Sequence, residues 1–335
     1  MKAFTLFILS LLTTFLQLNA VTAQQSLVQD YAQVMQIPEI SALEASASHL
    51  YVQSEQEGMA VFRIQPDNIQ WLYTSSGMQR RGLSADVRFA YLAGENRRLT
   101  VLEPTSVLGV YSATMLPQKP LATARLQNNL YIALGETGLG SLSLETPETI
   151  DSEIKIADGI GKEIGVIDVM SSPFTKQLFV LTESSKLDIF SVDGGELTFS
   201  KSLNITQQLS NLFIDGDHVW GSSSRGDVYE ITANGLGKKI GSVKEPVQTI
   251  LYWKDYTLIR STSGKVWYTH ADNNSLVSWK TDVQAGNFIA KSGEQLWIAE
   301  NDKISNIATA TVTQNVTSNP TGPFSIKDIQ NQILT

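Results

Sequence analysis

Four arginines in two adjacent pairs are the residues with the clearest capacity for chemistry in this 335-residue chain. They are Arg80-Arg81 and Arg97-Arg98. A guanidinium is permanently charged, and its paired donors match the oxygens of a carboxylate, sulfate or phosphate. Four guanidiniums in one place would bind such an anion, on a chain whose net charge is −8. The competing interpretation is four solvated arginines that pair with Glu95 and Glu103, because surface ion pairs are common and weak.

Carboxylates offer a second kind of chemistry. Asp215, Asp217 and Glu136 are candidates for the acid and base of an enzyme that acts on a carbohydrate or a small organic ester. Glycoside hydrolysis requires two carboxylates separated by roughly 5 to 10 Å. Asp215 and Asp217, with nearby Asp227, could also offer oxygens to calcium, although an Asp-Gly hairpin turn explains the same residues.

Other catalytic signatures are not found in the sequence. The three histidines, His49, His218 and His270, lie far apart without a second ligand at metal spacing, and the chain has no cysteine. Phosphate-binding loops, nucleophile elbows, zinc-protease motifs and dinucleotide fingerprints do not occur. We therefore expect no cofactor and no metal, and favour binding over catalysis.

One tripeptide has a possible adhesive meaning. Arg225-Gly226-Asp227 spells an integrin-type adhesion motif in a segment that we expect to form an exposed turn. The simpler interpretation is a polar hairpin, because the equivalent segment of the next repeat is Ser261-Thr262-Ser263-Gly264.

The elements that position these residues form a sevenfold repeat. Each copy has a short apolar run, a polar turn and a second run of alternating apolar residues. The first runs are centred on Tyr51, Tyr91, Tyr131, Phe179, Val219, Thr257 and Trp297, with a mean step of 41 residues. One four-stranded propeller blade needs a period of this size. We predict an all-β protein, a seven-bladed β-propeller of four-stranded antiparallel blades.

The first repeat shows the expected strands best. Strand A, nearest the axis, is predicted at Ser41–Ser46, followed by B at His49–Gln53, C at Met59–Ile64 and D at Ile69–Thr74. In a propeller, the loop from D to the next A lies on the same face as the B–C turn. This topology would bring Arg80-Arg81 close to Arg97-Arg98. The segment Leu27–Ile37 could supply a strand that closes the ring and removes exposed sheet edges.

Two segments resemble a known kind of repeat. Leu130 to Leu144, and more loosely Leu50 to Ile64, are similar to the repeats named for LVIVD or YVTN in exported bacterial propellers. The resemblance implies a seven-bladed exported ring and little about its ligand. The chain departs from the pattern where an Asp usually ends the strand, because Arg63, Ser143 and Ser191 stand at or near that position.

The two ends of the chain predict export and a further module. Residues 1–23 have the basic start, apolar run and small residues of a secretory signal peptide. The propeller is expected over residues 26–311, and residues 312–335 as a linker with the possible start of an Ig-like or cadherin-like β module. We expect a monomer in the periplasm or on the surface of a Gram-negative-type bacterium.

The amino-acid composition limits the kinds of partner that the chain is expected to bind. The net charge becomes −9 once Lys2 is removed, which disfavours nucleic acid, and the mature chain has no integral membrane segment. The most consistent function is a binding or scaffold module that recognises a protein or a glycan through a polar propeller face.

Overall fold

The computed structural model describes residues 26–28, 37, 39–56, 58–65, 69–75, 83–86, 88–94, 96–104, 110–145, 152–154, 164–194, 196–271, 276–279, 288–300 and 303–310. Every regular element in these residues is a β-strand. By its internal contacts the chain divides into one unit of Tyr31–Asn306 and a second unit of Met1–Asp30 with Ile307–Thr335. The larger unit contains every described candidate residue.

The larger unit contains six complete four-stranded antiparallel blades, whose strands A to D follow one another in the chain. Blade 1 consists of β2 (Ile40–Ala45), β3 (His49–Ser54), β4 (Gly58–Ile64) and β5 (Ile69–Ser75). Blade 2 consists of β6 (Leu83–Ala85), β7 (Ala90–Ala93), β8 (Arg98–Leu102) and β9 (Val110–Met115). Blade 3 consists of β10 (Ala122–Leu126), β11 (Asn129–Ala133), β12 (Leu139–Ser143) and β13 (Ser152–Ile154).

The next three blades repeat the same order. Blade 4 consists of β14 (Val166–Ser172), β15 (Gln177–Thr182), β16 (Lys186–Asp193) and β17 (Glu196–Asn204). Blade 5 consists of β18 (Asn211–Asp215), β19 (His218–Ser222), β20 (Asp227–Thr232) and β21 (Gly235–Ser242). Blade 6 consists of β22 (Val247–Trp253), β23 (Tyr256–Ser261), β24 (Val266–His270) and β25 (Val277–Ser278).

A seventh sheet takes its strands from both ends of the chain. It comprises β26 (Phe288–Ser292), β27 (Gln295–Glu300), β28 (Lys303–Ala310) and β1 (Ser26–Val28), in that order across the sheet. In the smaller unit, β1 pairs antiparallel with the end of β28, with Ser26 opposite Ala310 and Val28 opposite Ala308. Strand β1 includes Leu27 and Val28 of the segment expected to close the ring, and residues 29–36 of that segment lie outside the described residues.

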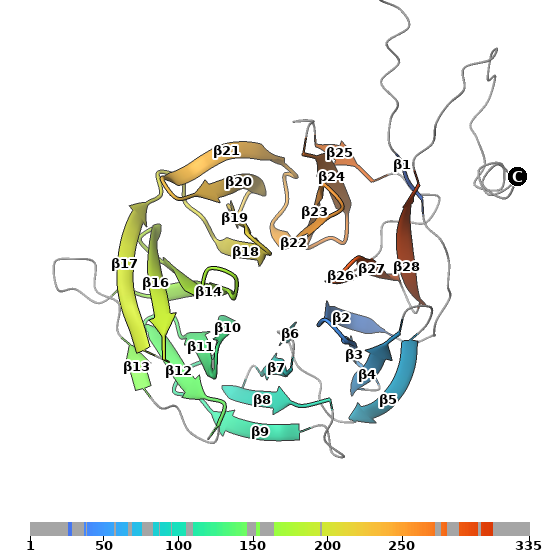
Figure 1. The fold of residues 1–335 in the computed structure, drawn as a ribbon, viewed down its shortest axis with the longest axis horizontal. Coiled ribbons are helices and arrows are strands. Elements are labelled where there is room, and N and C mark those ends of the chain that lie inside the picture. Colours follow the sequence, from blue (N-terminus) through green and yellow to red (C-terminus); the bar gives the residue numbers. More distant parts are fainter. Residues whose placement is uncertain are drawn as a thin grey trace, which may run out of the picture. The chain divides into compact units, whose positions relative to one another are not determined.

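The innermost strands of the larger unit surround one axis (Figure 1). Strand β2 lies beside β26 as well as β6, and the contacts continue through β10, β14, β18 and β22. Between β6 and β10, the Ser84 and Thr123 hydroxyl groups are 2.6 Å apart. The predicted all-β propeller of four-stranded antiparallel blades is confirmed, and the blade 1 strands lie within one residue of their expected bounds.

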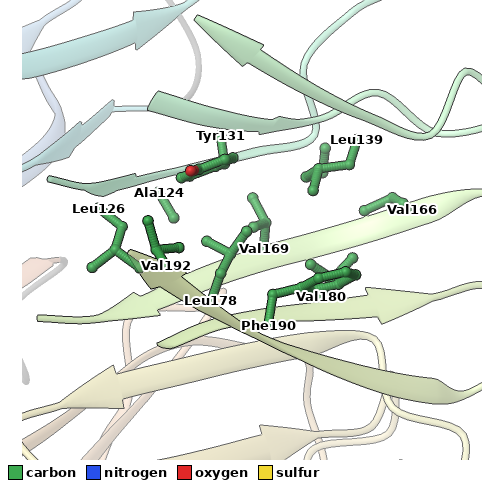
Figure 2. Close-up of a cluster of buried hydrophobic side chains, with 11 residues drawn as sticks. Ala124, Leu126, Tyr131, Leu139, Val166, Val169, Leu178, Val180, Phe190 and Val192 are labelled. Carbon is green, nitrogen blue, oxygen red and sulfur yellow. The ribbon is translucent and has the colours of Figure 1, made fainter. Parts of the chain in front are cut away.

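The core lies between adjacent blades, because each blade buries both faces against its neighbours. Figure 2 shows one such cluster, in which Ala124, Leu126 and Tyr131 of blade 3 pack with Val169 and Leu178 of blade 4. A similar cluster joins Leu43 and Phe62 of blade 1 to Trp297 of β27. Apolar residues that alternate along each strand thus supply both faces of a blade.

Antiparallel strands give every blade two ends. The A–B and C–D turns lie at one end, here called the A–B end, and the B–C turns and D–A loops lie at the other, the B–C end. The two are separated by the length of a strand, roughly 17 Å for the five residues of β11 at about 3.4 Å each.

Candidate functional site

Charged side chains at the A–B end are paired across neighbouring sheets, and the first group joins blades 5 and 6 to strand β26. The Lys291 ammonium on β26 lies 2.6 Å from each carboxylate oxygen of Asp215 on β18. It also donates to the Tyr252 carbonyl oxygen of β22 at 2.7 Å, and the Tyr252 N–H donates to Asp215 at 2.8 Å. Both charged side chains are largely buried. Asp215 is therefore engaged in holding three inner strands together.

A second group joins blades 2 and 3. The Arg125 guanidinium on β10 lies 3.0 Å from the carboxylate of Asp86, which follows β6. Asp86 also accepts the Tyr91 hydroxyl and the N–H groups of Arg88 and Phe89. Around the buried Phe89 ring, the guanidiniums of Arg88 and Arg125 lie 4.7 and 5.4 Å from its centroid. These charges are likewise committed to the joint between blades.

The three carboxylates considered for an enzyme are not brought together at one end of the blades. Asp215 and Asp217 lie at an A–B turn, whereas Glu136 lies in the B–C turn between β11 and β12, at the other end of the blades. The roughly 17 Å length of a strand exceeds the separation that hydrolysis between two carboxylates permits. Asp217 is mostly exposed, and Asp215 is neutralised by Lys291. Gly216, at φ 65°, makes the Asp-Gly segment the hairpin turn that the sequence also suggested.

Buried carboxyl groups also lie on the inner strands between the two ends. Asp168 on β14 accepts the Leu212 N–H of β18 at 2.6 Å and the Val169 N–H at 2.8 Å. Burial raises the pKa of Asp168 to about 7, against the opposing effect of these two donors. On β2, burial raises the pKa of Glu44 to about 8. Asp168 therefore joins blade 4 to blade 5 through backbone groups, and no cation pairs with it among the described residues.

The B–C end carries the described half of the predicted arginine site. Arg97 and Arg98 are exposed at the turn between β7 and β8, whereas Arg80 and Arg81 lie outside the described residues. Arg97 has left-handed backbone at φ 62° and donates from its guanidinium to the Pro117 carbonyl oxygen at 3.2 Å. Glu103, one of the two partners in the competing interpretation, binds Arg88 at 2.9 Å, and the other, Glu95, lies outside the described residues. Within the described part of the chain, no carboxylate pairs with Arg97 or Arg98.

The adhesion-type tripeptide forms the B–C turn of blade 5. Gly226 has φ 82°, and a Cβ at this position would lie 2.1 Å from the Glu245 carbonyl oxygen. Asp227 is bound to Lys239 at 2.7 Å. The Gly is thus required by the turn and the Asp is paired, which supports the polar-hairpin interpretation.

A further arginine at the B–C end is buried. Arg260, near the end of β23, has 3 % of its surface exposed. Its Nη1 group donates to the side-chain oxygen of Gln248, and its guanidinium stacks 4.4 Å from the centroid of the Phe288 ring on β26. The Nε group is buried without a hydrogen-bond partner. Among the described residues, no carboxylate lies within ion-pair distance of Arg260.

The histidines remain separate. His49 is buried on β3, where its Nδ1 lies 2.9 Å from the Ser48 hydroxyl and burial lowers its pKa. His218 packs against the rings of Trp220 and Tyr252, and His270 packs against Tyr256. No group of three or more His, Cys, Asp or Glu side chains that could hold a metal ion occurs in the described ranges.

Sequence reasoning missed Arg260 and the cross-blade ion pairs. The available signal for Arg260 is a charge inside the apolar strand Tyr256–Ser261. Asp215 and Lys291 are separated by 76 residues, so that no local motif connects them. They lie close together because the inner strands of successive sheets lie side by side around the axis.

Comparisons with known proteins leave the family open. A scan against models of known protein families found no match, and a search of curated proteins found no significantly similar sequence. In the described part of the chain, no helix has the length and hydrophobicity needed to cross a bilayer.

Proposed function

We propose that this chain is an exported binding module that recognises a protein or a glycan through the B–C end of its propeller. The observation that supports this proposal is the contrast between the paired inner-strand charges of the A–B end and three arginines of the B–C end. At the A–B end, Asp86 and Asp215 are held by Arg125 and Lys291. At the B–C end, Arg97, Arg98 and Arg260 have no carboxylate partner among the described residues, which favours recognition of an external acidic group.

The proposal includes the setting of the module. Residues 1–23 would direct export to the periplasm or the surface of a bacterium, and a seven-bladed ring of the LVIVD or YVTN type would span residues 26–311. Residues 312–335 would connect the ring to a following β module. Arg80 and Arg81 would complete the exposed arginine group. Purification of the exported protein and sequencing of its N-terminus tests the first part, with Gln24 as the expected first residue.

A face-specific binding experiment tests recognition. The mature chain is applied to a panel of neutral and acidic oligosaccharides and peptides, together with two double variants. Arg97→Ala with Arg98→Ala alters the B–C end, and Arg88→Ala with Lys254→Ala alters exposed residues of the A–B end. We expect acidic members to bind and the first variant alone to lose at least tenfold in affinity. Equal losses in both variants, or no binding to any acidic member, would refute the proposal.

A further inference from the structure

Among the described residues, no carboxylate lies close enough to Arg260 to balance its charge. Burial lowers the pKa of Arg260 to about 10, so the guanidinium remains charged at neutral pH. A buried charge is expensive unless an opposite charge or a complete set of acceptors surrounds it. The described surroundings provide one amide oxygen, from Gln248, and one aromatic ring, from Phe288.

The orientation of the side chain follows from the strand. Ile259 packs in the cluster between blades 5 and 6. Successive side chains of a strand point to opposite faces, so Arg260 is directed toward blade 7, where it meets Phe288. Gln248 lies at the bulge of β22 beside Thr249, which pairs with Arg260, and is itself exposed. The guanidinium therefore lies one side chain below the surface of the B–C end.

The edge of the guanidinium that makes no described hydrogen bond indicates which chemical group it could bind. Nη1 is bound to Gln248, and Nε has no partner, so the edge formed by Nε and Nη2 makes no described hydrogen bond. Two parallel N–H groups on this edge match the two oxygens of a carboxylate. A single guanidinium balances one negative charge, whereas a doubly charged phosphate would need a further cation on an acidic protein.

We propose that Arg260 is the anchor of a carboxylate-binding site between blades 6 and 7, with Gln248 orienting the guanidinium and Phe288 covering one of its faces. The proposal deepens the proposed function, since it assigns a ligand group to the same end of the propeller. The carboxylate can belong to an acidic sugar or to the C-terminus of a peptide. Both present the same planar anion to the guanidinium.

Thermal unfolding with small anions tests the site. Glucuronate represents the sugar source, N-acetylglycine the peptide source, and inorganic phosphate and chloride serve as comparison anions at equal ionic strength. We expect a carboxylate to raise Tm by roughly 5 to 10 °C at a concentration about a hundredfold above its Kd. The better of the two carboxylates identifies the source.

Three variants test whether the Tm shift depends on Arg260. Arg260→Met should raise Tm without ligand, because it removes an unpaired buried charge, and should abolish the carboxylate shift. Arg260→Lys retains the charge but loses the paired donors, so its Kd should be at least tenfold weaker. Arg225→Met replaces an exposed arginine in the B–C turn of blade 5, at the same end of the propeller, and should leave the shift unchanged.

Three outcomes would overturn the inference. They are no carboxylate shift in the wild-type chain, tighter binding of phosphate than of either carboxylate, and a lower Tm of Arg260→Met without ligand. The last would mean that the guanidinium already has a counter-charge. Failure here would leave panel binding through Arg97 and Arg98 possible, and failure of the panel would leave small-carboxylate binding possible, so the two proposals are distinguishable.

Discussion

The two ends of the propeller use charged side chains in different ways. At the A–B end, Lys291 bridges Asp215 and Tyr252, and Arg125 binds Asp86, so that charges connect neighbouring inner strands. At the B–C end, the arginines Arg97 and Arg260 have no described carboxylate partner. The comparison teaches that the number of charges on a face is a poor guide to its function. The pairing state separates charges that hold the fold together from charges that remain available for a ligand.

The largest effect is expected from pH, because Asp168 joins two blades and no cation pairs with it in the described part of the chain. Its pKa is about 7 in the folded chain and near 4 when unfolded, so the folded state binds more protons between these values. Stability should fall by up to about 4 kcal/mol as pH rises from 4 to 7, and Glu44, with its raised pKa, acts in the same direction. Denaturant unfolding at several pH values measures this slope. An Asp168→Asn variant should show a clearly smaller slope, and an equal slope would contradict the assignment.

Two matched glycine substitutions compare the turns at the two ends of the propeller. In Gly226→Ala at the B–C end, the new Cβ would collide with the Glu245 backbone at positive φ, and we expect a loss of about 3 kcal/mol. Gly216→Ala at the A–B end also has positive φ but meets no atom within 4 Å, and should lose about 1 kcal/mol. Chemical denaturation measures both losses. Similar losses would show that the close backbone contact of the B–C turn is unimportant.

Removal of a lysine compares a cross-blade ion pair with a surface ion pair. Lys291→Met leaves the largely buried Asp215 without its cation and should cost about 2 kcal/mol. Lys265→Met removes a lysine whose side chain is 63 % exposed and which pairs with Glu245, and should have a much smaller effect, because exposed ion pairs contribute little. The same denaturation assay applies. If Lys265→Met were the more damaging change, the structural role of the A–B charges would be disproved.

The smallest effect concerns the backbone that presents Arg97. Arg97→Gly relieves the left-handed conformation at φ 62° and should raise stability by about 0.5 kcal/mol, after the greater freedom of unfolded glycine is counted. Arg98→Gly is the matched control, since Arg98 begins strand β8 and glycine weakens a strand. Equal destabilisation by both changes would argue against strain at Arg97.

The strands were predictable from the sequence to a greater extent than the site. The repeat places Tyr51 and Tyr131 on strand B because alternation and period are local properties, and the blade 1 strands followed closely. The pairing of Lys291 with Asp215 depends on how distant strands surround the axis, which no local pattern encodes. The two described arginines of the predicted site are exposed at the expected turn, but Arg260 was missed because its burial depends on Phe288 from the next blade.

Nuclear magnetic resonance of the arginine Nε–H groups, recorded as glucuronate is added, tests the central claim most directly, with the signals assigned through Arg→Lys variants. We expect the Arg260 signal to shift with saturation, while that of Arg125, already bound to Asp86 at the A–B end, stays unchanged. A saturating shift of Arg125 with an unchanged Arg260 signal would contradict it.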